Sequence, residues 1–107
     1  MLLDGHPVPS CLTAVSMALG KQVQTIEGLA ESEELHPVQQ AFVEGGAMQC
    51  GYCVPGMILA ATALLERNPD PSEDEIKRGL NSNLCRCCGY TNIVKAVQLA
   101  ARAAQHA

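Results

Sequence analysis

From residue 36 to the end of the chain, apolar residues recur every three or four positions, which is the spacing of an amphipathic helix. A helix is predicted to open at His36-Pro37, because proline fits the first turn, and to end at Gly45-Gly46. Its apolar face carries Val38, Ala41 and Phe42. A second helix is predicted to start at Val54-Pro55 and to close at Asn68-Pro69. Its stripe is formed by Met57, Ala61, Leu64 and Leu65.

Two further helices follow from local signals. Ser72 and Glu75 form the pattern of a capping box, which predicts a third helix that carries Ile76 and Leu80. Asn81-Ser82-Asn83 interrupts the pattern. A fourth helix is predicted after Gly89, and its apolar face is formed by Ile93, Val97, Ala100, Ala101 and Ala104.

The first part of the chain has a different pattern. Residues 2–12 are predicted to form an extended pair that turns at Asp4-Gly5, residues 12–19 a short helix stopped by Gly20, and residues 22–26 a short strand. Two or three short strands are not stable alone, so this segment is expected to be part of something larger or to dock on a partner. The acidic stretch 28–35 is predicted to be a solvated linker.

Five of the six cysteines lie in two short runs, Cys50-Gly51-Tyr52-Cys53 and Cys85-Arg86-Cys87-Cys88, separated by 31 residues. Two pairs of thiolates brought together by a fold make a four-sulfur site, which suits zinc or an iron–sulfur cluster better than magnesium or calcium. Each half of a structural zinc site usually contains two cysteines separated by two to four residues, and the spacing Cys-x-Cys is less usual. Spacing favours iron–sulfur without excluding zinc, and the formal charge of the two sites is the same.

The order is helix, cysteine run, helix, twice over, so a four-helix arrangement with approximate two-fold symmetry is predicted. Each run then leads into a helix N-terminus. The unpaired N–H groups and partial positive charge there stabilise thiolates and an anionic cluster.

Composition narrows the class of protein. The chain has 107 residues, enough for one modest core, with three aromatic residues and no Trp, so the core must be aliphatic and is expected to be mainly helical. A net charge of −4 with seven basic residues argues against nucleic acid as a partner. No long apolar stretch or signal peptide is recognised, so a cytoplasmic location without membrane attachment is expected. In that compartment the cysteines are expected to bind metal and not to form disulfides.

The sequence around the cysteines resembles the signature motifs of the iron–sulfur subunits of the molybdenum hydroxylases. This is the family of xanthine oxidase, aldehyde oxidoreductase and carbon monoxide dehydrogenase. The matching stretches are residues 49–57 and 83–94, together with 35–42 and 68–71. The resemblance implies a mainly α, four-helix [2Fe–2S]-binding domain at residues 29–107. Residues 1–28 would be a short β remnant of a plant-type ferredoxin domain.

The resemblance also implies roles for single residues. Cys50, Cys53, Cys85 and Cys87 would ligate the [2Fe–2S] cluster. Gln49 resembles the glutamine that hydrogen-bonds the molybdopterin, and Cys87 the ligand nearest to it. Gly51 and Gly89 would let the backbone approach the cluster. Arg86 would lie beside the cofactor or serve as a surface charge. Cys88 departs from the family pattern, which usually has Thr there, and is interpreted as a small buried residue beside the cluster, with substitution for a neighbouring ligand as the alternative.

Cys11 matches the fourth cysteine of the family's plant-type ferredoxin domain, and the three preceding cysteines are absent. The chain alone is therefore expected to hold one cluster. It would be a truncated form, or another chain would complete the ferredoxin domain.

The implied function is electron transfer from a molybdopterin centre on a large subunit, through the [2Fe–2S] cluster, towards a second cluster and FAD on a medium subunit. No residue of the chain supplies catalysis, since His6 and His36 are interpreted as turn and helix-start residues and His106 as solvated. Two alternatives stay open: a structural Zn(Cys)4 interaction module, and a remnant that folds but transfers electrons inefficiently.

Overall fold

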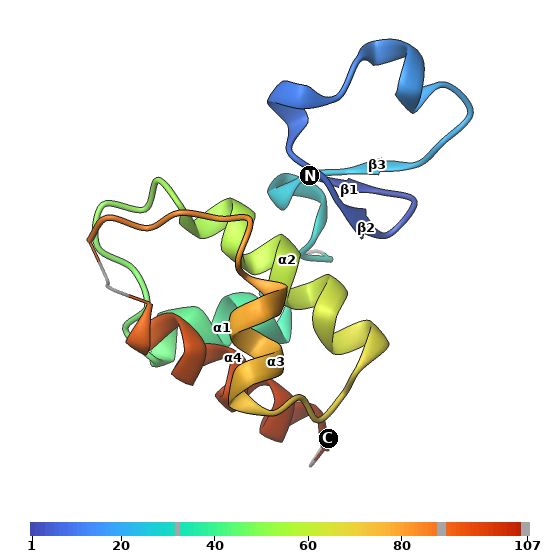
Figure 1. Cartoon of the computed structure of the whole chain (residues 1–107). Helices are drawn as coiled ribbons and strands as arrows, with labels where there is room; N and C mark the ends of the chain where they lie inside the picture. The colour runs from blue at the N-terminus through green and yellow to red at the C-terminus, as the bar shows by residue number, and fades with distance from the viewer. Residues whose placement is uncertain (32, 88–89, 106–107) are drawn as a thin grey trace.

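The computed structural model describes residues 1–31, 33–87 and 90–105 of the chain. Within these residues a group of α-helices packs beside a small antiparallel sheet that is formed by the start of the chain (Figure 1). The helices are α1 (Pro37–Glu44), α2 (Val54–Arg67), α3 (Glu73–Gly79) and α4 (Thr91–Gln105). The mainly α fold class is therefore confirmed.

The helix boundaries follow the predicted signals. His36 caps α1, because its Nδ1 accepts a hydrogen bond from Val38 N at 3.2 Å and its own N–H donates to Gln39 Oε1 at 2.9 Å. Ser72 caps α3 in the same reciprocal way with Glu75. The predicted capping box and both proline starts are confirmed. The structure ends α3 at Gly79, so Leu80 is its C-cap and not a residue of the helix.

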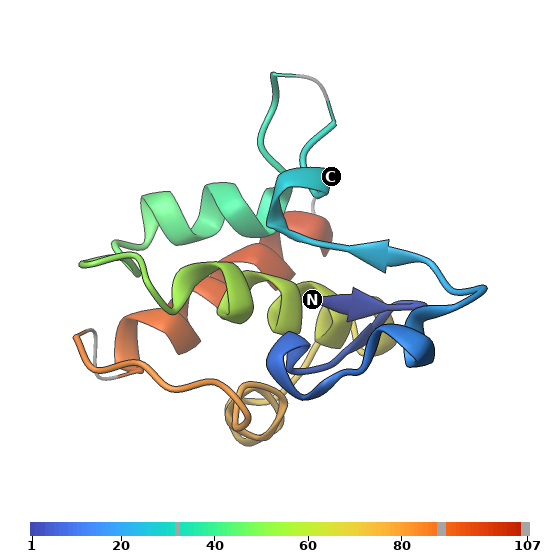
Figure 2. The same cartoon turned by 90° about the horizontal axis from the view of Figure 1, so that it is seen from above.

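The core lies where α2 meets the other helices. Phe42 of α1, Met57 of α2, Ile76 of α3 and Ile93 of α4 are all fully buried. Figure 2 shows α1 and α4 lying along α2, so that the helices share one interior. Ala104 was predicted to be on the buried face of α4, but it is exposed. That last turn of α4 lies beyond the apolar contacts, which run as far as Ala101.

The N-terminal segment forms a three-stranded sheet with the order β2-β1-β3, and all of its pairs are antiparallel. The strands are β1 (Leu2–Leu3), β2 (His6–Pro7) and β3 (Val23–Gln24). The predicted turn at Asp4 and Gly5 is confirmed, with φ of 50° and 82° at the two residues. Leu2 is buried and belongs to the same apolar cluster as the helices. The small sheet is thus supported by α2.

The prediction of a short helix over residues 12–19 was wrong. The structure has two 3-10 turns there, at Ser10–Leu12 and Val15–Ala18. Their apolar side chains point to solvent, and Val15 is 85% exposed. Because these side chains are exposed, burial of an apolar face does not offset the cost of ordering a regular helix here. The linker prediction also needs correction at Leu29, which is buried in the core after the 3-10 turn Ile26–Gly28.

Candidate metal centre

The fold brings the two cysteine runs to the same end of the molecule. In Figures 1 and 2 the loop before α2 and the loop before α4 lie side by side, on the side away from the small sheet. A direct hydrogen bond joins them, from Gln49 Nε2 to the carbonyl oxygen of Cys87 at 3.1 Å. Asn92 of α4 adds a second link, because its Nδ2 donates to Gly46 O at 3.5 Å. Residues far apart in sequence thus face one another.

Three of the sulfur atoms interact electrostatically. The pKa of Cys50 is lowered, first by the backbone N–H of Tyr52 and then by a hydrogen bond from the Cys87 thiol. The same hydrogen bond raises the pKa of Cys87, which keeps its proton as the donor. The negative charge of Cys85 acts on both groups and raises their pKa values. Cys50 is therefore the first of this pair to become a thiolate, the form that binds metal.

The four cysteines differ in their exposure to solvent. Cys50 and Cys87 are exposed, whereas Cys53 and Cys85 are partly buried and pack against the apolar core. Cys53 is the N-cap of α2, and the second run ends directly before α4. The prediction that each run leads into a helix N-terminus is confirmed. Helix N-termini carry unpaired N–H groups and a partial positive charge, and those of α2 and α4 are near the runs in sequence, which favours an anionic site.

Tyr90 is a site residue that the sequence reasoning missed. Its hydroxyl oxygen accepts a hydrogen bond from Cys85 N at 2.9 Å, and its carbonyl accepts the N–H of Val94 in the first turn of α4. Its φ of 71° lies in the left-handed region, where a residue with a bulky side chain is strained. A tyrosine five residues after a cysteine, at a helix start, was the available signal. Tyr90 therefore fixes the second run to α4.

The glycine and arginine of the runs have simpler explanations. Gly51 has a φ of +83°, a conformation that glycine adopts without strain, and no protein atom would contact a Cβ there. Its close approach to a cluster stays a prediction. Arg86 is exposed, as expected for a surface charge. Cys88, Gly89 and His106 lie outside the described residues.

The donor set fits a cluster held by thiolates, since two cysteines come from each run and Cys50, Cys85 and Cys87 interact electrostatically. No group of three His, Cys, Asp or Glu side chains suited to a single metal ion is found in residues 1–31, 33–87 and 90–105. A [2Fe–2S] cluster would be held by four thiolates, two on each iron.

The remaining predicted residues lie elsewhere. Cys11 is exposed in the 3-10 turn Ser10–Leu12 of the N-terminal segment, and it belongs to neither of the two runs. His6 lies in β2, and His36 serves as a helix cap, so neither belongs to the centre. None of the helices in the described part of the chain has both the length and the apolar character of a membrane span.

The family can be assigned from comparison with known proteins. Residues 25–98 match the model of the "[2Fe-2S] binding domain". The chain belongs to this family. The family assignment confirms the resemblance drawn from the cysteine motifs, and the matched region contains both runs and all of α1, α2 and α3.

Relatives within the family are iron–sulfur subunits. The nicotinate dehydrogenase small FeS subunit of Eubacterium barkeri is 47% identical over 100 residues, which is 94% of this chain and 64% of that protein. The xanthine dehydrogenase iron-sulfur-binding subunit of Escherichia coli O157:H7 is 48% identical over 99 residues, or 91% of this chain and 62% of that protein. The structure of quinoline 2-oxidoreductase from Pseudomonas putida 86 aligns with a TM-score of 0.90 and 42% identity, over 98% of this chain and 66% of that one. The chain thus spans slightly less than two thirds of the length of these family members.

Proposed function

We propose that the chain is an electron-transfer subunit of a molybdenum-containing hydroxylase or dehydrogenase. In this proposal Cys50, Cys53, Cys85 and Cys87 hold a [2Fe–2S] cluster. Electrons reach it from a molybdopterin centre on a large partner subunit and leave towards a second cluster and FAD on a medium subunit. This chain binds the cluster and holds it in position, and the substrate is oxidised on the large partner subunit.

The observation that carries the proposal is the contact between the two cysteine runs. Gln49 Nε2 donates a hydrogen bond to the Cys87 carbonyl oxygen at 3.1 Å, and the Cys50 and Cys87 thiols shift each other's pKa, within a domain of the [2Fe–2S] binding family. We therefore assign Cys50 and Cys87 to one iron and Cys53 and Cys85 to the other.

The surrounding residues position this centre. The N-termini of α2 and α4 stabilise its negative charge, and Tyr90 holds the backbone of Cys85. When bound, the cluster accepts and releases one electron at a time. The exposed sulfurs Cys50 and Cys87 form the side nearest to a partner. We infer that Gln49 and Cys87 face the molybdopterin, as the resemblance implies.

The rest of the chain is assigned as follows. Residues 29–107 form the four-helix cluster domain with approximate two-fold symmetry, and residues 1–28 belong to a plant-type ferredoxin domain. Cys11 would ligate a second [2Fe–2S] cluster whose other three ligands come from elsewhere. The exposed position of Cys11 supports this, because a neighbouring segment has access to its sulfur. A cytoplasmic location, where thiolate ligands stay reduced, belongs to the same proposal.

The experiment is substrate reduction in the assembled complex. The complex is purified with its molybdopterin-binding subunit, substrate is added without oxygen, and the visible absorption of the cluster is followed. The proposal expects bleaching at a rate no slower than turnover. A cluster that stays oxidised would instead indicate an electron-transfer remnant. A colourless chain that contains one zinc and no iron would show the structural zinc module.

A further inference from the structure

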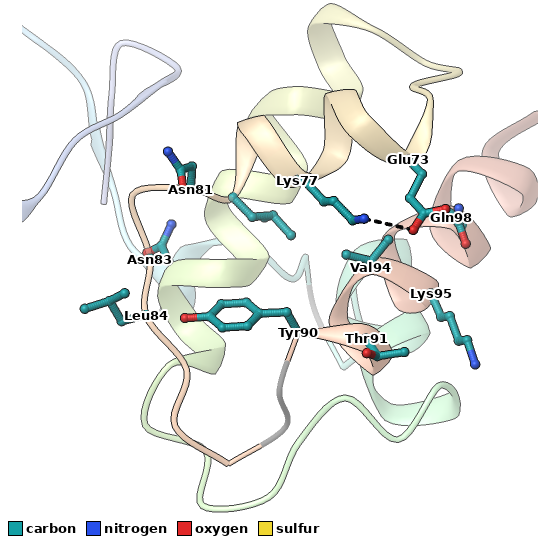
Figure 3. Close-up of a pocket in the computed structure, with 11 residues that line it drawn as sticks. Glu73, Lys77, Asn81, Asn83, Leu84, Tyr90, Thr91, Val94, Lys95 and Gln98 are labelled. Carbon is teal, nitrogen blue, oxygen red and sulfur yellow. Dashed lines mark ion pairs between the residues drawn. The ribbon is translucent and has the colours of Figure 1, made fainter.

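A groove lies between α3 and α4, next to the second cysteine run, and has a volume of about 650 Å³ (Figure 3). Its walls come from the two helices and from the loop that precedes the run. Leu80 and Val94 form a buried apolar floor. Leu84 and Tyr90 lie at the end nearest to the cysteines, where the tyrosine ring points towards the loop.

Two of the lining side chains are large, partly apolar and exposed to solvent. Leu84 is 84% exposed and Tyr90 is 38% exposed. They border the second run on both sides, so their apolar surface is continuous with the groove. An apolar surface with a polar rim has the composition of a protein–protein interface. Asn81, Asn83 and Gln98 supply that polar rim.

The charge of the groove differs from that of the whole chain. The lining residues include Lys77 and Lys95 but only one acidic residue, Glu73, in a chain of net charge −4. Glu73 is already paired with Lys77 at 3.2 Å, and Figure 3 shows Lys95 extending from α4 at the opposite edge. The groove therefore favours an occupant that combines apolar side chains with a carboxylate.

We propose that an acidic, apolar segment of the molybdopterin-binding subunit occupies this groove. The inference rests on the proposed function, which directs that subunit to the end of the molecule where Gln49 and Cys87 lie. The groove opens at the same end. Tyr90 belongs both to the groove and to the hydrogen bond that holds Cys85, so the docked segment contacts the residue that positions a ligand.

The test compares groove variants with matched variants on the N-terminal segment. Leu84→Ser is paired with Val15→Ser, because the two side chains are 84% and 85% exposed. Lys95→Glu is paired with Lys21→Glu, another exposed lysine. Each full-length chain is loaded with iron and sulfide, and its Kd for the purified molybdopterin-binding subunit is measured at low and high salt.

Leu84→Ser is expected to raise the Kd about tenfold or more. Lys95→Glu is expected to raise it several-fold, more at low salt than at high salt. The two control variants should stay within about twofold of the original chain. Unchanged affinity in both groove variants would overturn the inference, as would equal losses in the controls or a weakening seen only with the FAD subunit or between copies of this chain.

The visible absorption of each variant separates this inference from the function on which it rests. If the groove variants have a full cluster spectrum and unchanged affinity, docking in the groove is refuted and the proposed function is not. Absence of iron from the original chain would refute the proposed function itself.

Discussion

Protonation of His36 is predicted to weaken the start of α1. The neutral imidazole accepts the Val38 N–H at 3.2 Å, and the protonated ring has no lone pair for this bond. Burial lowers the pKa of His36 below 6.5, an effect that the charge of Glu66 partly opposes. The folded state therefore prefers the neutral form more than the unfolded state does.

The direction of the pH dependence follows from this shift. Stability from the neutral imidazole is fully present above pH 6.5, the pKa of the unfolded chain, and is lost as the pH falls through the lower folded value. Loss of an N-cap costs about 1 kcal/mol. The side chain is only partly buried, so solvent screening keeps the effect near or below that figure. For a domain of this size, about 1 kcal/mol corresponds to a Tm change of about 4–8 °C.

The assay is urea unfolding of the cluster-loaded chain between pH 7.5 and 5.5, followed by circular dichroism. His36→Asn keeps an N-cap acceptor but does not titrate in this range, so its unfolding free energy should lose the pH-dependent component. His6→Asn, at an exposed position in β2, is the matched control and should behave as the original chain does. If His36→Asn and the original chain lost equal stability below pH 6.5, the assignment of this titration to the cap would be wrong.

Three further predictions concern packing and positioning. Phe42→Ala should lower the free energy of unfolding by about 3–5 kcal/mol, because the ring is fully buried. Val43→Ala should change it little, because this side chain is half exposed on the same helix. If urea unfolding gave similar losses for the two variants, the placement of Phe42 in the core would be contradicted. Ser72→Ala should lower the free energy of unfolding by about 1 kcal/mol, and Ser72→Asn should lower it much less, since asparagine is also a good N-cap residue. Equal losses of stability in the two variants would argue against a capping role for Ser72. Tyr90→Phe removes the acceptor of the Cys85 N–H and should lower the Tm of the loaded chain by the equivalent of about 1 kcal/mol. Tyr52→Phe, with a side chain that is 94% exposed, should leave the Tm unchanged, and a Tyr90→Phe variant as stable as this control would contradict the role of the hydroxyl.

The helices could be predicted because their signals are local. The proline after His36, the Ser72–Glu75 pair and the glycines at 45 and 46 each act within one or two turns of the chain. The cysteine motifs were similarly informative, because the residues that would hold a cluster are confined to two short stretches. The structure adds that these stretches meet, through Gln49 and Cys87.

What could not be predicted depends on distant parts of the chain. Residues 12–19 have helical composition, but Val15 and Met17 stay exposed in the fold, and the segment forms 3-10 turns. Leu29 lies in an acidic stretch yet is buried, because the helical core offers it an apolar site. The Tyr90–Cys85 hydrogen bond and the groove beside it depend on how α3 and α4 are placed, which no local pattern specifies.

The most direct test of the central claim is the iron and acid-labile sulfide content of the purified chain and two of its cysteine variants. Two irons per chain are predicted, bound by the thiolates of the two runs. Cys11→Ser should retain both irons, because Cys11 belongs to the N-terminal segment and to neither cysteine run, and Cys53→Ser should lose them. One zinc in place of iron, or iron that survives Cys53→Ser but not Cys11→Ser, would contradict the account.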